Sequence, residues 1–181
     1  MAASITHYSL PAPVFDQPTR ALLVVSPYYR EIADQLLLGA KSACEEAQVM
    51  YDVVEVPGAL EIPTAIALAA KSGEYDAYVA LGCVIRGETT HYDTVCNDSS
   101  RGLTLLGLEG NAIGNAILTV ENVDQAVVRA EAVGQNKGGG AAVAALHLVA
   151  LKRRFNKTPA VKADGGEFKM AGHADPLGDL A

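Results

Sequence analysis

The segment Arg86–His91 holds the densest group of residues in this sequence that can do chemistry. His91 carries an imidazole, which titrates near neutral pH and can move protons. Thr89 offers a hydroxyl group at the expected start of a helix, where free N–H groups and the helix dipole favour a phosphate. Gly87 lets the backbone approach a ligand closely. Taken alone, however, a Thr-Thr-His sequence is better explained by a helix cap followed by a surface histidine.

Other chemically capable residues are more scattered. Tyr28 and Tyr29 are suited to stacking on a flat heterocycle, although aromatic residues at a strand end are more often packing residues. Arg129 has the charge for a phosphate, yet an arginine on a helix is usually solvated. Lys137 precedes three glycines without the GxxxxGK[ST] spacing of a phosphate loop, which favours a helix start there. No grouping of His and Cys has the spacing of a metal site.

The elements that must position these residues alternate between strands and helices. Short apolar runs predict strands, and apolar residues at helical spacing predict helices. The expected strands are 21–25, 51–56, 77–85 and 116–120, and the expected helices are 29–47, 60–70, 91–106, 123–133 and 138–155. Such alternation indicates an α/β fold, a three-layer α/β/α sandwich around a four-stranded parallel sheet. Ligands of such sheets bind beyond the carboxyl ends of the strands, where the polar, aromatic and glycine residues gather here.

Length and composition limit the remaining possibilities. A chain of 181 residues with 50% hydrophobic residues suits one globular domain. Its net charge of −7 disfavours nucleic-acid and membrane surfaces as partners. Three widely spaced cysteines and a start unlike a signal peptide favour a cytoplasmic protein. We expect an N-terminal arm (1–19), a domain (20–155) and a flexible C-terminal tail (156–181).

Five segments in this order resemble the lumazine synthases: VPGALEIP (56–63), LGCVIRGETTHYDTV (81–95), ILTVEN (117–122), RA (129–130) and NKG (136–138). The resemblance runs from about Ala21 to Phe155. It implies a transferase of riboflavin biosynthesis with a flavodoxin-like sheet. Such an enzyme condenses 5-amino-6-(D-ribitylamino)uracil with 3,4-dihydroxy-2-butanone 4-phosphate to 6,7-dimethyl-8-ribityllumazine, without cofactor or metal. It also implies a homopentamer with active sites between adjacent subunits, which some members pack into an icosahedral shell.

The resemblance assigns roles to individual residues. His91 matches the proton donor. The positions matching contacts to the ribitylaminouracil are Tyr28, Ala59, Leu60, Glu61, Cys83, Val84, Ile85 and Asn115. Those matching contacts to the butanone phosphate are Glu88, Thr89 and Arg129, and Lys137 matches a supporting lysine. Asn115 stands where many members carry Phe, and it would come, with Arg129, from the neighbouring subunit. A stretch around Tyr8–Val14 would add a strand to a neighbouring sheet.

Two alternatives to the enzyme remain at this level. A binding paralogue would keep the pocket for a flavin or a lumazine without turnover, and would be expected to lose His91 or Arg129, both of which are present. A flavodoxin-like nucleotide-binding domain would carry a glycine-rich loop after the first strand, where this sequence has SPYYRE. The enzyme therefore accounts for the motifs best.

Overall fold

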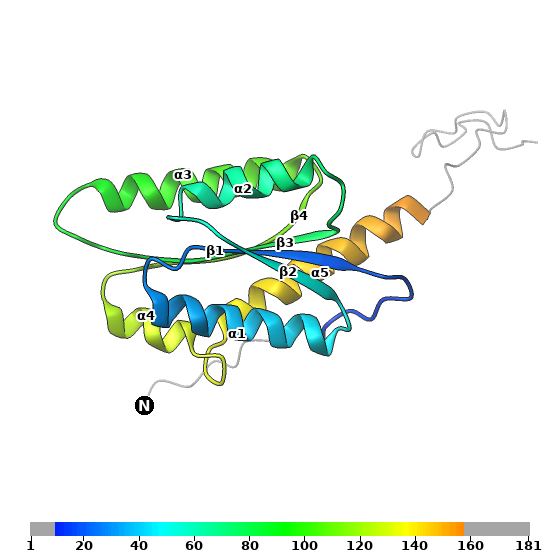
Figure 1. Ribbon diagram of the computed structural model, residues 1–181, viewed down its shortest axis with the longest axis horizontal. Helices are drawn as coiled ribbons and strands as arrows, with labels where there is room; N and C mark the ends of the chain where they lie inside the picture. The colour runs from blue at the N-terminus through cyan, green and yellow to red at the C-terminus, as the bar shows by residue number, and fades with distance from the viewer. Residues whose placement is uncertain (1–9, 158–181) are drawn as a thin grey trace, which may run out of the picture.

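The computed structural model describes residues 10–157, in which strands and helices alternate along the chain (Figure 1). The strands are β1 Arg20–Val25, β2 Met50–Glu55, β3 Ala77–Ile85 and β4 Ala112–Val120. The helices are α1 Arg30–Glu46, α2 Glu61–Ala70, α3 His91–Leu108, α4 Val123–Ala130 and α5 Lys137–Lys157. The expected number, order and type of elements over this part of the chain are confirmed.

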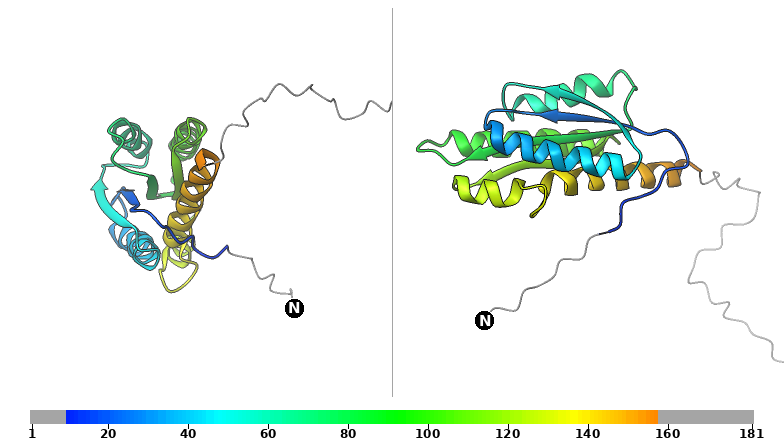
Figure 2. Two further views of the ribbon diagram at one scale, coloured as in Figure 1. Left: turned by 90° about the vertical axis from the view of Figure 1, so that its right-hand side faces the viewer. Right: turned by 60° about the horizontal axis from the view of Figure 1, so that its bottom comes forward.

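The four strands form one parallel sheet in the order β2-β1-β3-β4. Helices α1, α4 and α5 cover one face, and α2 and α3 cover the other (Figures 1 and 2). The two faces carry separate apolar cores, because successive side chains of a strand point to opposite sides. Leu23 of β1 packs toward α1 and α5, whereas Leu22 and Val24 pack toward α2 and α3. The α/β/α sandwich is confirmed.

The apolar stripe expected on the first helix is the buried face of α1, where Ile32, Leu36, Ala40 and Ala43 all lie in the core. At Gly138, at the start of α5, a Cβ would overlap the backbone carbonyl of Leu36. The absence of that carbon lets α1 and α5 cross closely. Gly138 thus sets the distance between α1 and α5.

Strand β4 begins at Ala112, whereas the sequence predicted a start at 116. The additional residues pair in parallel with Ala77–Ala80 of β3. Gly114 and Asn115 lie in this part of the strand, and both residue types are poor strand formers, which hid it from the sequence. Gly114 is required for packing, because a Cβ there would overlap the carbonyl of Ala141 in α5.

Three other expectations need adjustment. The helix expected at 123–133 ends at Ala130, and the helix expected at 91–106 runs on to Leu108. Strand β2 lies at the sheet edge and is largely exposed, although the sequence argument assigned every strand to a covered position.

The described residues include only part of the expected N-terminal arm and C-terminal tail. Residues 10–19 of the expected arm form no strand within this chain, and Phe15 packs against the main core. Residues 156–157 complete α5, and the rest of the expected tail lies outside the described residues, as do 1–9. None of the helices between residues 10 and 157 is long and apolar enough to span a membrane.

Candidate active site

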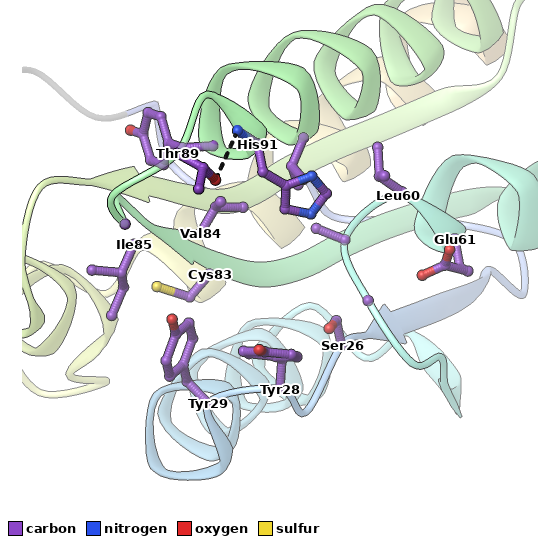
Figure 3. A pocket seen from close by; sticks show the side chains of 15 residues that line it. Ser26, Tyr28, Tyr29, Leu60, Glu61, Cys83, Val84, Ile85, Thr89 and His91 are labelled. Carbon is purple, nitrogen blue, oxygen red and sulfur yellow. Dashed lines mark hydrogen bonds between the residues drawn. The ribbon is translucent and has the colours of Figure 1, made fainter.

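A cavity of about 370 Å³ opens at the carboxyl end of the sheet (Figure 3). Strand β1 lies between β2 and β3 in the sheet. The connection after β1 leads to β2 on one side of it, whereas the connection after β3 leads away toward β4, so a crevice forms between the ends of β1 and β3. The cavity is where parallel sheets of this kind bind ligands. The predicted site residues that line it are Tyr28, Ala59, Leu60, Glu61, Cys83, Val84, Ile85, Thr89 and His91.

The loop between β3 and α3 forms one wall of the cavity. The Oγ1 atom of Thr89 accepts a hydrogen bond from the backbone N–H of His91 at 3.3 Å, so Thr89 caps the start of the helix. Thr90 occupies the N-cap position without a side-chain hydrogen bond. Figure 3 shows the His91 imidazole reaching from α3 into the cavity. The loop thus caps α3 and brings the imidazole of its first residue to the cavity.

Two tyrosines at the end of β1 form the opposite wall. Tyr28 is 74% exposed, which leaves its ring free to stack on a planar ligand. Its ring centroid lies 5.1 Å from that of Tyr29 in an edge-to-face arrangement. Burial raises the pKa of Tyr29 above its ordinary value, and the neighbouring Tyr28 and Cys83 add to this effect. The raised pKa keeps the Tyr29 phenol in its neutral form.

The end of β3 forms the floor of the cavity. Burial raises the pKa of the Cys83 thiol to about 11, so the thiol is protonated at neutral pH and is a poor nucleophile. Cys83 therefore acts as a small apolar wall. Backbone groups at the strand end, with Val84 and Ile85, border the same space.

The segment after β2 closes the side of the cavity. Gly58 and Ala59 precede α2, and Glu61 is its first residue. Figure 3 places the Glu61 carboxylate beside the cavity. A Cβ on Gly58 would lie 2.8 Å from Oε2 of Glu61, so the glycine leaves room for this carboxylate.

The other four predicted site residues do not line this cavity in the single chain. Asn115 borders a separate cavity between α3, β4 and α5, and its Oδ1 accepts a hydrogen bond from the N–H of Ile117 at 2.8 Å. Arg129 lies on α4, where its Nη1 donates to the carbonyl of Gln125 at 2.9 Å. Lys137 is the first residue of α5. Glu88 is exposed on the loop before α3.

The residue types of Tyr29 and Gly87 suggested a role at the site, and both line the cavity although the resemblance gave them none. The lining residues that the sequence analysis missed are Ser26, Gly58, Tyr92 and Val95. Ser26 and Tyr29 flank Tyr28 at the end of β1. Val95 lies one turn after His91 on the same face of α3, which helical spacing would indicate, whereas Tyr92 directly follows His91. Within residues 10–157, no group of three His, Cys, Asp or Glu side chains is placed to hold a metal ion.

Comparison with known proteins gives a consistent match over the domain. The model of the 6,7-dimethyl-8-ribityllumazine synthase family matches residues 18–153. A protein of that name from Jannaschia sp. is 52% identical over 143 residues, which are 79% of this chain and 80% of the relative. One from Sphingopyxis alaskensis is 54% identical over 134 residues, 74% of this chain and 95% of the relative. One from Bartonella tribocorum is 56% identical over 136 residues, 74% of this chain and 90% of the relative.

Proposed function

Because this chain belongs to the 6,7-dimethyl-8-ribityllumazine synthase family, we propose that it is the transferase that makes 6,7-dimethyl-8-ribityllumazine in riboflavin biosynthesis. It condenses 5-amino-6-(D-ribitylamino)uracil with 3,4-dihydroxy-2-butanone 4-phosphate and releases phosphate and water. One observation carries the assignment to this site. One cavity is bordered by the Tyr28 ring, by the Glu61 carboxylate and by the capped start of α3 with His91.

The pyrimidine fits the side of the cavity formed by β1, β3 and the segment before α2. Tyr28 stacks on the ring, and the end of β3 at Cys83–Ile85 meets its polar edge. Ala59, Leu60 and Glu61 hold the ribityl chain, whose hydroxyl groups donate to the Glu61 carboxylate. A hydrogen bond to a charged acceptor is stronger than one between neutral groups, so Glu61 contributes most to ribityl binding.

The butanone phosphate fits the side formed by the loop before α3. Thr89 and Glu88 lie on this loop, and the start of α3 attracts the phosphate through its dipole. Arg129 supplies the positive charge. With a net charge of −7, the overall field of this protein repels an anion, so a local cation is needed to retain it.

The reaction then proceeds by positioning and proton transfer. The 5-amino group adds to the ketone carbonyl and water leaves to give an imine. Phosphate is eliminated next, and the ribityl-bearing nitrogen closes the second ring with loss of a further water. His91 moves protons between these groups, because its imidazole reaches into the cavity. Holding two substrates together in the correct orientation provides much of the acceleration.

We also propose that the working unit is a homopentamer with sites shared between neighbours. Arg129 and Asn115 lie away from the cavity of their own chain, which supports their use in the next one. Apolar side chains are exposed on α4, where Val123 is 56% and Val128 49% exposed. The exposed edge of β2 offers a place for a strand from the N-terminal arm of a neighbour. Sedimentation velocity distinguishes a pentamer of 18.9-kDa chains from an icosahedral shell of pentamers.

The decisive experiment is turnover by the purified protein. Both substrates are supplied at saturating concentration without added metal, and lumazine absorbance and free phosphate are followed. Formation of both products in equal amounts supports the enzyme. Tight binding of the lumazine by a folded oligomer that forms no product would identify a binding paralogue instead.

The thiols of Cys44, Cys83 and Cys96 are all free, which fits a site of action in the reducing cytoplasm.

A further inference from the structure

Arg86 follows the last residue of β3 and lies outside the lining of the cavity. Its backbone N–H donates to the carbonyl of Val120 at 3.0 Å, which continues the pairing of β3 with β4 by one residue. The backbone of Arg86 is therefore part of the rigid sheet. Its side chain leaves from a fixed point close to the loop that carries Thr89 and His91.

The guanidinium of Arg86 has three partners. Its Nε lies 2.9 and 3.2 Å from the two carboxylate oxygens of Glu121, just beyond the end of β4. Its Nη1 lies 3.2 Å from Oδ1 of Asp93. Its Cζ lies 4.0 Å from the centre of the Tyr92 ring, which is the distance of a cation–π contact. One planar group thus connects the acidic residue that follows β4 with two residues of α3.

Tyr92 and Asp93 directly follow His91 in the first turn of α3. The hydrogen bonds within that turn are local, from the N–H of His91 to Thr89 and from the N–H of Asp93 to the Thr90 carbonyl. Among the polar side-chain contacts of the described residues, those of Arg86 join this turn to the sheet. Arg86 thus ties the turn that carries His91 to the end of the sheet.

We propose that Arg86 is a positioning residue for the reaction: through Tyr92 and Asp93, it sets where His91 and Thr89 stand relative to the bound butanone phosphate. This inference rests on the proposed function. Arginine suits the task because its planar fork can bind two carboxylates and stack on a ring at the same time. Its ion pairs are about half exposed, and such pairs add little to stability. A misplacement of about 1 Å at a reacting group, in contrast, can lower the rate about 100-fold.

The test replaces Arg86 by glutamine and measures kcat and KM for each substrate separately, with the other substrate saturating. We expect kcat/KM for the butanone phosphate to fall roughly 10- to 100-fold, while KM for the ribitylaminouracil stays within about twofold. The pyrimidine keeps its contacts to Tyr28, Glu61 and β3. The melting temperature and the oligomer size should match those of the wild type. Arg86→Lys should restore only part of the activity, because lysine keeps the charge but loses the fork and the ring contact.

A double-mutant cycle with Glu121 separates positioning from direct contact with substrate. Glu121→Gln loosens the anchor of Arg86 without touching the cavity, so it should show the same selectivity between substrates with a smaller loss. In the double variant the losses should not multiply, because both changes remove one linkage. Arg20→Gln is the matched control. Arg20 lies at the start of β1, far from the cavity. Its Nη2 lies 2.7 Å from Oδ2 of Asp52, and its Cζ lies 5.2 Å from the centre of the Tyr75 ring.

The outcomes distinguish this inference from the proposed function. A wild-type protein without turnover refutes the proposed function, and with it the positioning role, which rests on that function. An active wild type whose Arg86→Gln variant is equally active, or loses affinity for both substrates alike, overturns the positioning role. If Glu121→Gln leaves the kinetics unchanged and Arg86→Lys retains full activity, Arg86 acts on the phosphate as a charge and the positioning role is wrong.

Discussion

Replacement of Gly58 by alanine tests how the cavity holds the ribityl chain. The added Cβ would lie 2.8 Å from Oε2 of Glu61 and 4.0 Å from its Cδ. The oxygen must therefore move by several tenths of an ångström, which the long glutamate side chain achieves by rotation. The backbone can stay where it is, because the carboxylate is the only group that a methyl at this position meets within 4 Å in the described structure.

The expected magnitude follows from the hydrogen bond that this movement weakens. A hydrogen bond to a charged group contributes about 1.5–3 kcal/mol, so its complete loss would weaken binding roughly 10- to 150-fold. Gly58→Ala displaces the acceptor without removing it, so we expect KM for the ribitylaminouracil to rise about tenfold. Folding stability should change little. Alanine lowers the entropy of the unfolded chain by an equivalent of about 0.4–1 kcal/mol, which offsets the cost of rotating the glutamate.

The assay measures KM for the ribitylaminouracil with the butanone phosphate saturating, and the melting temperature of each variant. Gly140→Ala serves as the control, because a Cβ at Gly140 meets no described atom within 4 Å. The same change is then made in a Glu61→Ala background. If Gly58→Ala acts through the carboxylate, it has no further effect on KM there. A tenfold rise in both backgrounds would show that the backbone of the segment, and not Glu61, determines ribityl affinity.

Four further outcomes are expected. His91→Ala should lower kcat roughly 10²-fold, the low end for a general acid–base group, with both KM values little changed; an unchanged kcat between about pH 6 and 8 would make the histidine a bystander. Arg129→Ala should raise KM for the butanone phosphate far more than KM for the pyrimidine, because a charged hydrogen bond of about 1.5–3 kcal/mol is lost; equal losses would indicate a structural arginine. Because burial raises the pKa of Cys83 to about 11, its alkylation by iodoacetamide, followed by mass spectrometry, should stay slow at pH 8 and accelerate only as the pH approaches that value; rapid labelling of the folded protein at pH 8 would contradict this. Gly138→Ala should destabilise the fold by about 1–3 kcal/mol in chemical denaturation, since its Cβ overlaps the Leu36 carbonyl; an unchanged unfolding midpoint would show that α1 and α5 separate freely.

The sequence alone was sufficient to predict the order of the elements and most of the cavity. Short apolar runs and helical spacing are local signals, and they located β1, β3 and α1 to within a residue or so. The site followed from a general property of parallel sheets, whose strands all end at one edge. Residues directly after β1, β2 and β3 therefore met in one cavity, although they are far apart in the chain.

Only the tertiary structure decided the features that depend on pairing and packing between distant segments. The first residues of β4 are a strand because β3 pairs with them and because Gly114 fits against Ala141, neither of which their own residue types indicate. The contacts of Arg86 with Glu121 and Asp93 arise in the same way, since the sheet brings the ends of β3 and β4 to the start of α3. Asn115 and Arg129 lie apart from the cavity for a related reason. Asn115 pairs with Ala80 in the first half of β4, before the carboxyl end of the sheet, and Arg129 lies on α4, on the face opposite α2 and α3.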